Sequence, residues 1–147
     1  MKQICSTILL FFAFAGSHAQ DFADYFQNKT LRVDYIFTGN AERQNIYLDE
    51  LSQLPSWAGR QHHLSELPLE GNGQIIVKDL ATQQTIYKTS FSSLFHEWLS
   101  TDEAKETAKG FENTFLLPFP KQPAEVEISL YSPRKEVMAV SYTHLTL

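Results

Sequence analysis

Cysteine is almost absent from this sequence, since its 147 residues include a single one, Cys5. Cys5 precedes the apolar run of an N-terminal segment that we expect to be removed from the mature protein. A mature chain without cysteine has no disulfide, no thiol nucleophile and no thiolate ligand for a metal. This excludes disulfide-stapled scaffolds, cysteine-dependent enzymes and zinc modules built on cysteine.

Basic residues are also few. The chain has 12 lysines and arginines against 17 aspartates and glutamates, which gives a formal net charge of −5 at pH 7. A mildly acidic domain without a basic cluster is a poor binder of nucleic acid. We therefore expect no nucleic-acid partner.

Long apolar runs are missing as well. The most apolar one, residues 8–14 (ILLFFAF), is far shorter than the roughly 20 residues that span a bilayer as a helix. It follows Lys2 and precedes Ser17-His18-Ala19, which puts small residues three and one positions before a cut after Ala19. We therefore expect residues 1–19 to be a signal peptide and expect no transmembrane segment. The mature protein is predicted to be secreted, periplasmic or on the cell surface.

The last residues need separate treatment. Residues 141–147, SYTHLTL, resemble the translated sequencing adapter found at the ends of truncated metagenomic reading frames. We expect this tail to be non-native, and the alternative is a genuine last strand. Residues 20–140 then form one domain, which is long enough to bury a core.

Short alternating segments dominate residues 20–140. Apolar and polar residues alternate along 30–38 and again along 125–131, as they do in half-buried strands. Strands are expected at 30–38, 46–48, 74–78, 85–89, 125–131 and 137–140, with 74–78 and 85–89 joined as a hairpin. The pattern predicts a mainly β fold, an antiparallel β-sandwich with one or two short helices.

Two other segments favour different structures. Residues 49–59 contain Leu51-x-x-Leu54-Pro55, which indicates a helical turn or an irregular crossing that ends at Pro55. Residues 101–109 are predicted to form a surface helix, because Ser100 and Glu103 have the spacing of a capping box.

The segment HEWLS at residues 96–100 begins like the zinc-peptidase motif H-E-x-x-H. That motif needs two histidines one helical turn apart to bind zinc, with a glutamate that activates water. Ser100 occupies the position of the second histidine, and serine is a poor zinc ligand. Apolar residues recur around it at helical spacing: Phe91, Leu94, Phe95, Trp98 and Leu99. We therefore expect a core face with a buried Trp98, and no metal site.

The remaining candidate sites also have simpler explanations. His62 and His63 are adjacent, and adjacent residues of a strand point to opposite faces. The carboxylates of Asp102, Glu103 and Glu106 suit the solvated first turn of a surface helix. Trp57 and Trp98 suit a core or a sugar-stacking platform, and the core is favoured. From the residues alone we assign no catalytic, cofactor-binding or metal-binding residue.

Segments spread from about Asp24 to Met138 match one known pattern in combination. They are residues 24–37 (DYFQNKTLRVDYIF), 57–60 (WAGR), 69–73 (LEGNG), 86–87 (IY), 90–95 (SFSSLF), 97–98 (EW), 111–114 (FENT) and 118–120 (PFP). Together they resemble the N-terminal domain of the IgA-peptidase-like secreted zinc metallopeptidases of gut bacteria. None of these segments is a catalytic signature.

The resemblance carries several implications. In that family the N-terminal domain is a β-sandwich, and the zinc and its H-E-x-x-H helix lie in a separate, later domain. It implies that this chain is a fragment without enzyme activity or a cofactor of its own, and that the missing catalytic domain is its partner. Its expected role is capture of substrate or support of that domain. The alternative is a free-standing secreted module that binds glycan or protein.

Overall fold

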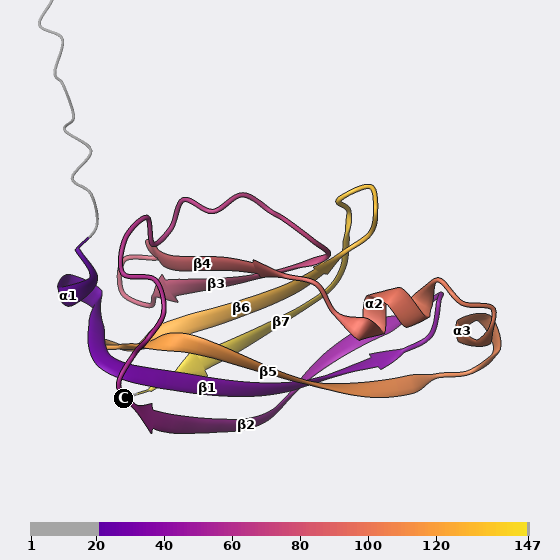
Figure 1. Ribbon diagram of the computed structural model, residues 1–147, viewed down its shortest axis with the longest axis horizontal. Coiled ribbons are helices and arrows are strands. Elements are labelled where there is room, and N and C mark those ends of the chain that lie inside the picture. The colour runs from indigo at the N-terminus through magenta and orange to yellow at the C-terminus, as the bar shows by residue number, and fades with distance from the viewer. Residues whose placement is uncertain (1–20, 147) are drawn as a thin grey trace, which may run out of the picture.

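The computed structural model describes residues 21–146, so the predicted signal peptide and Cys5 lie outside the described residues. The described chain contains three short helices and seven strands (Figure 1). In chain order they are α1 (Phe22–Tyr25), β1 (Phe26–Gly39), β2 (Gln44–Pro55), β3 (Gly73–Asp79), β4 (Thr85–Phe91), α2 (Leu94–Leu99), α3 (Glu103–Glu106), β5 (Lys109–Pro120), β6 (Ala124–Tyr131) and β7 (Val137–Leu145).

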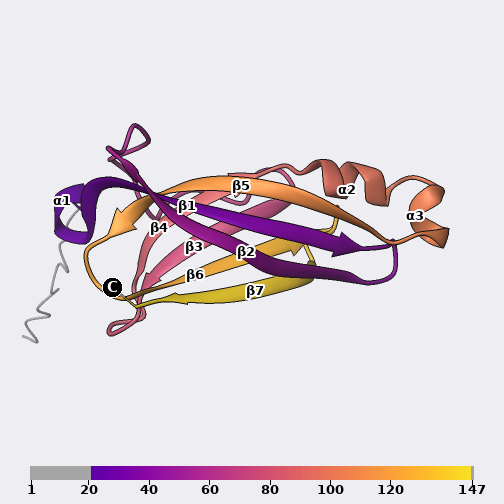
Figure 2. The ribbon, with the colours of Figure 1, turned by 90° about the horizontal axis from the view of Figure 1, so that it is seen from below.

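The strands form two antiparallel sheets. One sheet has the order β2-β1-β5 and the other the order β4-β3-β6-β7. The two sheets lie face to face, with α1 and the end of β7 at one end and α2 and α3 at the other (Figure 2). The predicted mainly β fold, an antiparallel sandwich with short helices, is confirmed.

The core lies between the sheets and follows the predicted alternation. From β1 the buried side chains are Leu31, Val33, Tyr35 and Phe37, and from β6 they are Val126, Ile128 and Leu130. Each such side chain contributes about 1.5–3 kcal/mol when it is fully buried. The β3–β4 hairpin adds Ile75 and Val77, and its strands pair as predicted.

A buried hydrogen bond also joins the two sheets. The hydroxyls of Tyr35 on β1 and Thr143 on β7 lie 3.0 Å apart. Burial raises the pKa of the Tyr35 hydroxyl, and the bond to Thr143 partly offsets this effect. Residues 141–145 thus belong to β7, while their non-native origin stays a prediction.

The prediction for residues 49–59 is wrong, because β2 runs unbroken to Pro55. The Leu51-x-x-Leu54 spacing does not mark one face of a helix, because Leu51 pairs with Val33 and Leu54 with Thr30, which puts the two leucines on opposite faces of the strand. The strand also contains a bulge. Leu48 pairs with Tyr35 and Leu51 pairs with Val33, so Asp49 is an extra residue in the strand. The bulge puts Leu48 and Leu51, which are three residues apart, on the same inner face.

The surface helix predicted over residues 101–109 is present only as the four-residue α3 (Glu103–Glu106), and the expected cap at Ser100 is wrong. Ser93 caps a different helix, α2, because its hydroxyl accepts from the N–H of His96 at 3.3 Å. Ser100 ends α2, and its hydroxyl donates to the carbonyl of Glu97 at 2.7 Å. The short α3 follows, and Lys109 already begins β5.

Candidate functional site

The His96-Glu97 pair lies on α2, a helix of six residues. His96 is half-buried beside Leu99 and Met138, and burial lowers its pKa although Glu97 opposes the effect. The hydroxyl of Ser100 is used to cap the helix. Within residues 21–146 no three histidine, cysteine or acidic side chains gather as metal ligands would.

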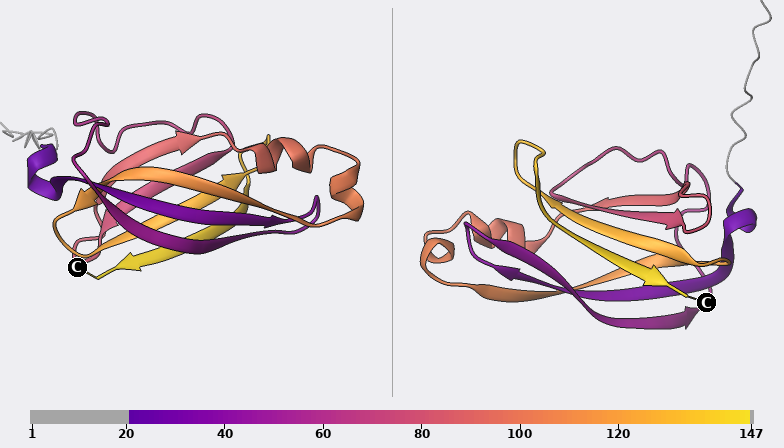
Figure 3. Two further views of the ribbon diagram at one scale, coloured as in Figure 1. Left: turned by 60° about the horizontal axis from the view of Figure 1, so that its bottom comes forward. Right: turned by 180° about the vertical axis from the view of Figure 1, so that it is seen from behind.

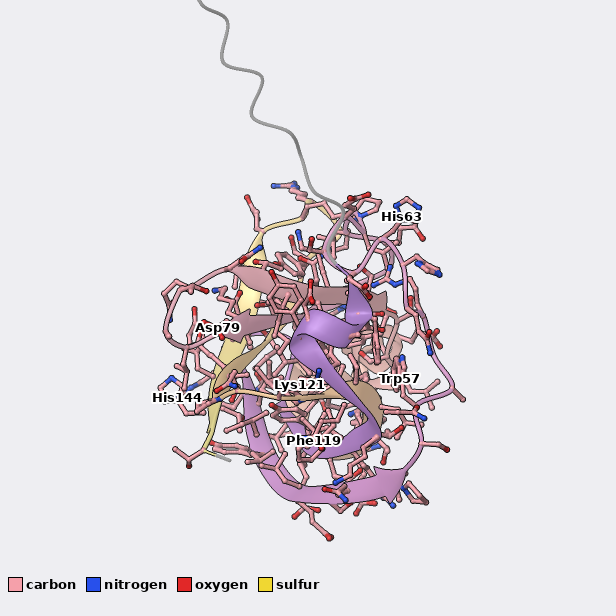
Figure 4. The ribbon with its side chains drawn as sticks, turned by 90° about the vertical axis from the view of Figure 1, so that its left-hand side faces the viewer. Trp57, His63, Asp79, Phe119, Lys121 and His144 are labelled. Carbon is pink, nitrogen blue, oxygen red and sulfur yellow. The ribbon has the colours of Figure 1, made fainter. Side chains whose placement is uncertain are left out.

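The adjacent histidines lie in the loop between β2 and β3 and not on a strand, so the reason given for separating them is wrong. His63 has a positive φ of 51°, and its ring Nδ1 lies 2.9 Å from the carboxylate of Glu66. The side chains of His63 and Glu66 are both largely exposed. His63 points outward at the edge of the molecule (Figure 4).

The three acidic residues near α3 differ in their surroundings, and Glu106, like Asp102, is exposed. Asp102 is exposed and pairs with Lys105, which fits the expected solvated turn. Glu103 instead accepts from Trp98 Nε1 at 3.0 Å and from Lys109 Nζ at 2.7 Å. The bond from Lys109 is the main cause of the lowered pKa of Glu103, and the bond from Trp98 adds to it. We call Trp98, Glu103 and Lys109 the clamp. The sequence analysis missed it because its members come from α2, α3 and β5.

Trp57 is 8% exposed, meets Tyr87 edge-on and donates to the carbonyl of Arg60, so its core assignment is confirmed. The expectation of a buried Trp98 holds only in part. Trp98 is half-buried, with Phe95 and Phe111 at ring distances of 6.0 and 5.5 Å and the ammonium of Lys109 over its ring. These contacts leave neither indole free as a sugar platform.

Leu94 does not belong to the predicted apolar face either. It is 70% exposed, while Phe95 is fully buried. The face of α2 that packs on the sandwich is therefore the one with Phe95 and Trp98, and it meets Phe111 at the start of β5. Leu94 lies in the first turn of this short helix and points away from that contact.

Two edges of the sandwich, β4 and β5, lie on the same side and are covered. The loop between β2 and β3 covers β4, since the N–H of Lys88 donates to the carbonyl of Leu64 at 2.8 Å. Arg60 reinforces this cover with bonds to the carbonyls of Leu64 and Lys88, and its guanidinium lies over Tyr87. Helix α2 packs against β5. We call this the closed side.

The opposite side contains the other two edges, β2 and β7, which run next to each other (Figure 3). We call it the open side. Most of the large exposed apolar residues are here: Tyr47, Leu48, Leu51 and Leu54 on β2, and Val137, Val140 and Tyr142 on β7. A groove of about 360 Å³ lies between the ends of these strands, with Leu51, Phe119 and His144 in its lining. This side is the candidate interaction surface.

Comparison with known proteins adds one clear match. A family model described as Peptidase M64 N-terminus matches residues 21–142. The matched range begins just before α1 and ends within β7, so it takes in both sheets. A search of curated proteins finds no match to the chain. In residues 21–146 no helix has the length and apolarity to cross a membrane.

Proposed function

Because the chain belongs to the family of peptidase M64 N-terminal domains, we propose that it is a non-catalytic accessory domain of a secreted zinc metallopeptidase. Its role is to hold polypeptide substrate for a catalytic domain of the same protein. Zinc belongs to that catalytic domain, and this domain carries no cofactor. Residues 1–19 direct export.

The observation that carries the proposal is the structure around the His96-Glu97 pair. In a zinc-peptidase helix the second histidine follows one turn after the first, on the same face. Here the helix stops at that position, and Ser100 bonds back to the carbonyl of Glu97. His96 is half-buried and lines one pocket with Leu99 and Met138. Peptide hydrolysis is therefore assigned to another domain.

The domain's surface supports a binding role over a purely structural one. Four apolar side chains of β2 are between 38% and 56% exposed. Exposed apolar groups that gather on one side of a small domain mark interaction sites. The glycan-binding alternative is less favoured, because Trp57 is buried and the half-buried Trp98 packs against Phe95 and Phe111.

The proposal is tested on the natural polypeptide that includes this domain and an H-E-x-x-H helix. Deletion of residues 21–142 is expected to raise KM for an unfolded protein substrate and to leave hydrolysis of a short peptide unchanged. A His96→Ala variant of the full polypeptide should retain its zinc and its kcat. Loss of one zinc equivalent in His96→Ala would contradict the proposal, as would an unchanged KM after the deletion.

A further inference from the structure

Strand β2 has an unpaired backbone edge. It bonds to β1 on one side only, over twelve residues, and no other strand among residues 21–146 pairs with its second side. Alternate N–H and C=O groups of an edge strand point outward, and they are a template for another extended chain. The edge of β4 is covered by a loop, which shows how this fold protects an edge. Among residues 21–146 no loop bonds to the outer edge of β2 in this way, and β7 runs beside it without pairing.

The side chains of β2 suit an added strand on both faces of the sheet. Leu48 and Leu51 pair with inward-facing residues of β1, so they lie on the groove side of the sheet. Tyr47 and Leu54 pair with Ile36 and Thr30, which puts them on the outer face. An extended chain beside β2 would place its alternate side chains against these two apolar pairs.

The charges of β2 select between possible occupants. Asp49 and Glu50 lie at the middle of the strand, both are exposed, and neither forms an ion pair within the described chain. If two copies of β2 paired about a twofold axis at that point, four carboxylates would meet. Like charges opposite each other destabilise a strand pair. The charges therefore oppose self-pairing and favour a chain with basic side chains.

We propose that the outer edge of β2 binds an extended polypeptide segment of alternating apolar and basic residues, which adds as a fourth strand to the sheet β2-β1-β5. This inference rests on the proposed function, since it names the substrate class that the accessory domain holds. Main-chain hydrogen bonds supply affinity in this mode, and side-chain contacts supply the preference for sequence.

The test measures the fluorescence anisotropy of a labelled peptide of alternating valine and lysine, added to the full chain. Two control peptides separate the contributions. In one, glutamate replaces lysine, and in the other alternate backbone nitrogens are methylated, which removes the donors of one edge. Both controls are expected to bind at least roughly tenfold more weakly than the parent peptide.

Two variants localise the binding. Glu50→Lys is expected to weaken the parent peptide roughly tenfold and to improve the glutamate peptide. Glu112→Lys is the matched control, because Glu112 is an exposed carboxylate of β5 at the other edge of the same sheet. It should leave the affinity unchanged. Circular dichroism and melting of each variant show whether it is folded.

Hydrogen exchange identifies the edge directly. Bound peptide is expected to protect amides of residues 44–55. Protection of β7 alone, equal binding of the methylated peptide, or a dimer joined through β2 would each overturn the inference.

The peptide experiment and the deletion experiment can fail separately. If KM rises on deletion of residues 21–142 while the peptide does not bind, the β2 site is wrong and the accessory role stands. If the peptide binds and KM does not change, the binding site stands and the proposed function is wrong.

Discussion

The closed side and the open side of the sandwich differ in the type of their apolar side chains and in how far these are buried. On the closed side aromatic rings pack in two groups, one around Tyr87 and one around Phe95. On the open side aliphatic side chains of β2 remain more than a third exposed. Aromatic residues, a loop and a helix thus pack at one pair of edges, while β2 and β7 keep exposed apolar side chains that offer a surface to a partner.

The largest expected effect comes from the closed side. Phe95 is fully buried and contacts Phe37, Trp98 and Phe111. Phe95→Ala is expected to lower the free energy of unfolding by about 3–5 kcal/mol. Leu51→Ala on the open side should cost well under half of that, because Leu51 is already 38% exposed. Urea denaturation measures both, and equal losses would erase the distinction between the sides.

The second prediction concerns the loop that covers β4. Arg60→Ala removes two hydrogen bonds to the carbonyls of Leu64 and Lys88 and the contact with Tyr87. We expect a loss of about 2 kcal/mol in unfolding free energy, typical of bonds from a charged donor. Amide exchange along β4 should also accelerate, since the edge becomes exposed. Arg43→Ala is the control, because Arg43 is exposed in the β1–β2 turn.

If exchange along β4 stays slow in Arg60→Ala, the loop holds without Arg60 and the cover is apolar in origin. Leu64, which is 1% exposed, would then be the residue that fixes the loop. Leu64→Ala would separate these two causes.

The third prediction concerns the bond between the sheets. Tyr35→Phe keeps the buried ring and removes the hydroxyl bonded to Thr143, at an expected cost of about 1 kcal/mol. Burial raises the pKa of Tyr35 in the folded protein. The unfolded chain therefore releases this proton first, and stability falls as pH rises above about 10.

That alkaline fall should be smaller in Tyr35→Phe than in the parent protein. It should not vanish, because burial also raises the pKa of Tyr87. Thr143→Val removes the same hydrogen bond and keeps the titrating hydroxyl, so it should retain the fall. Denaturation midpoints between pH 8 and 11 compare the three proteins, and identical pH profiles would show that Tyr35 does not contribute.

Local patterns allowed part of this fold to be predicted. The β3–β4 hairpin and the strand β6 follow from alternation and nearby turns, which depend only on neighbouring residues. The start of α2 could not be predicted from such local patterns. Asn72 bonds to both the N–H and the hydroxyl of Ser93, so a contact across 21 residues fixes where the helix begins. The capping-box spacing at Ser100 could not reveal this.

The open side could not be predicted from the sequence either, because it too depends on contacts between residues that are distant in the chain. The pattern of β2 shows which residues are apolar, but the bulge at Asp49 decides which face they occupy. Whether an edge is covered depends on a loop that is distant in sequence, as for β4 and Leu64. The sequence alone could predict that residues 96–100 are no zinc-peptidase motif, because that conclusion needs only the identity of the residue at position 100, which is serine and not histidine.

The smallest expected effect concerns the clamp of Glu103, Trp98 and Lys109 beside α2. Glu103→Gln keeps the shape and weakens the bonds from the indole and the ammonium. The pKa of Glu103 is lowered in the folded protein, mainly by the bond from Lys109. Its contribution is therefore complete above the ordinary pKa of glutamate and disappears as pH falls through the lowered value. Because the ion pair of Glu103 and Lys109 is exposed, the free energy of unfolding should change little.

The fluorescence of Trp98 should report the protonation of Glu103, with an emission shift on acidification in the parent protein and none in Glu103→Gln. The same acid shift in both proteins would assign it to another group near the indole and leave α3 without a role in closing this side.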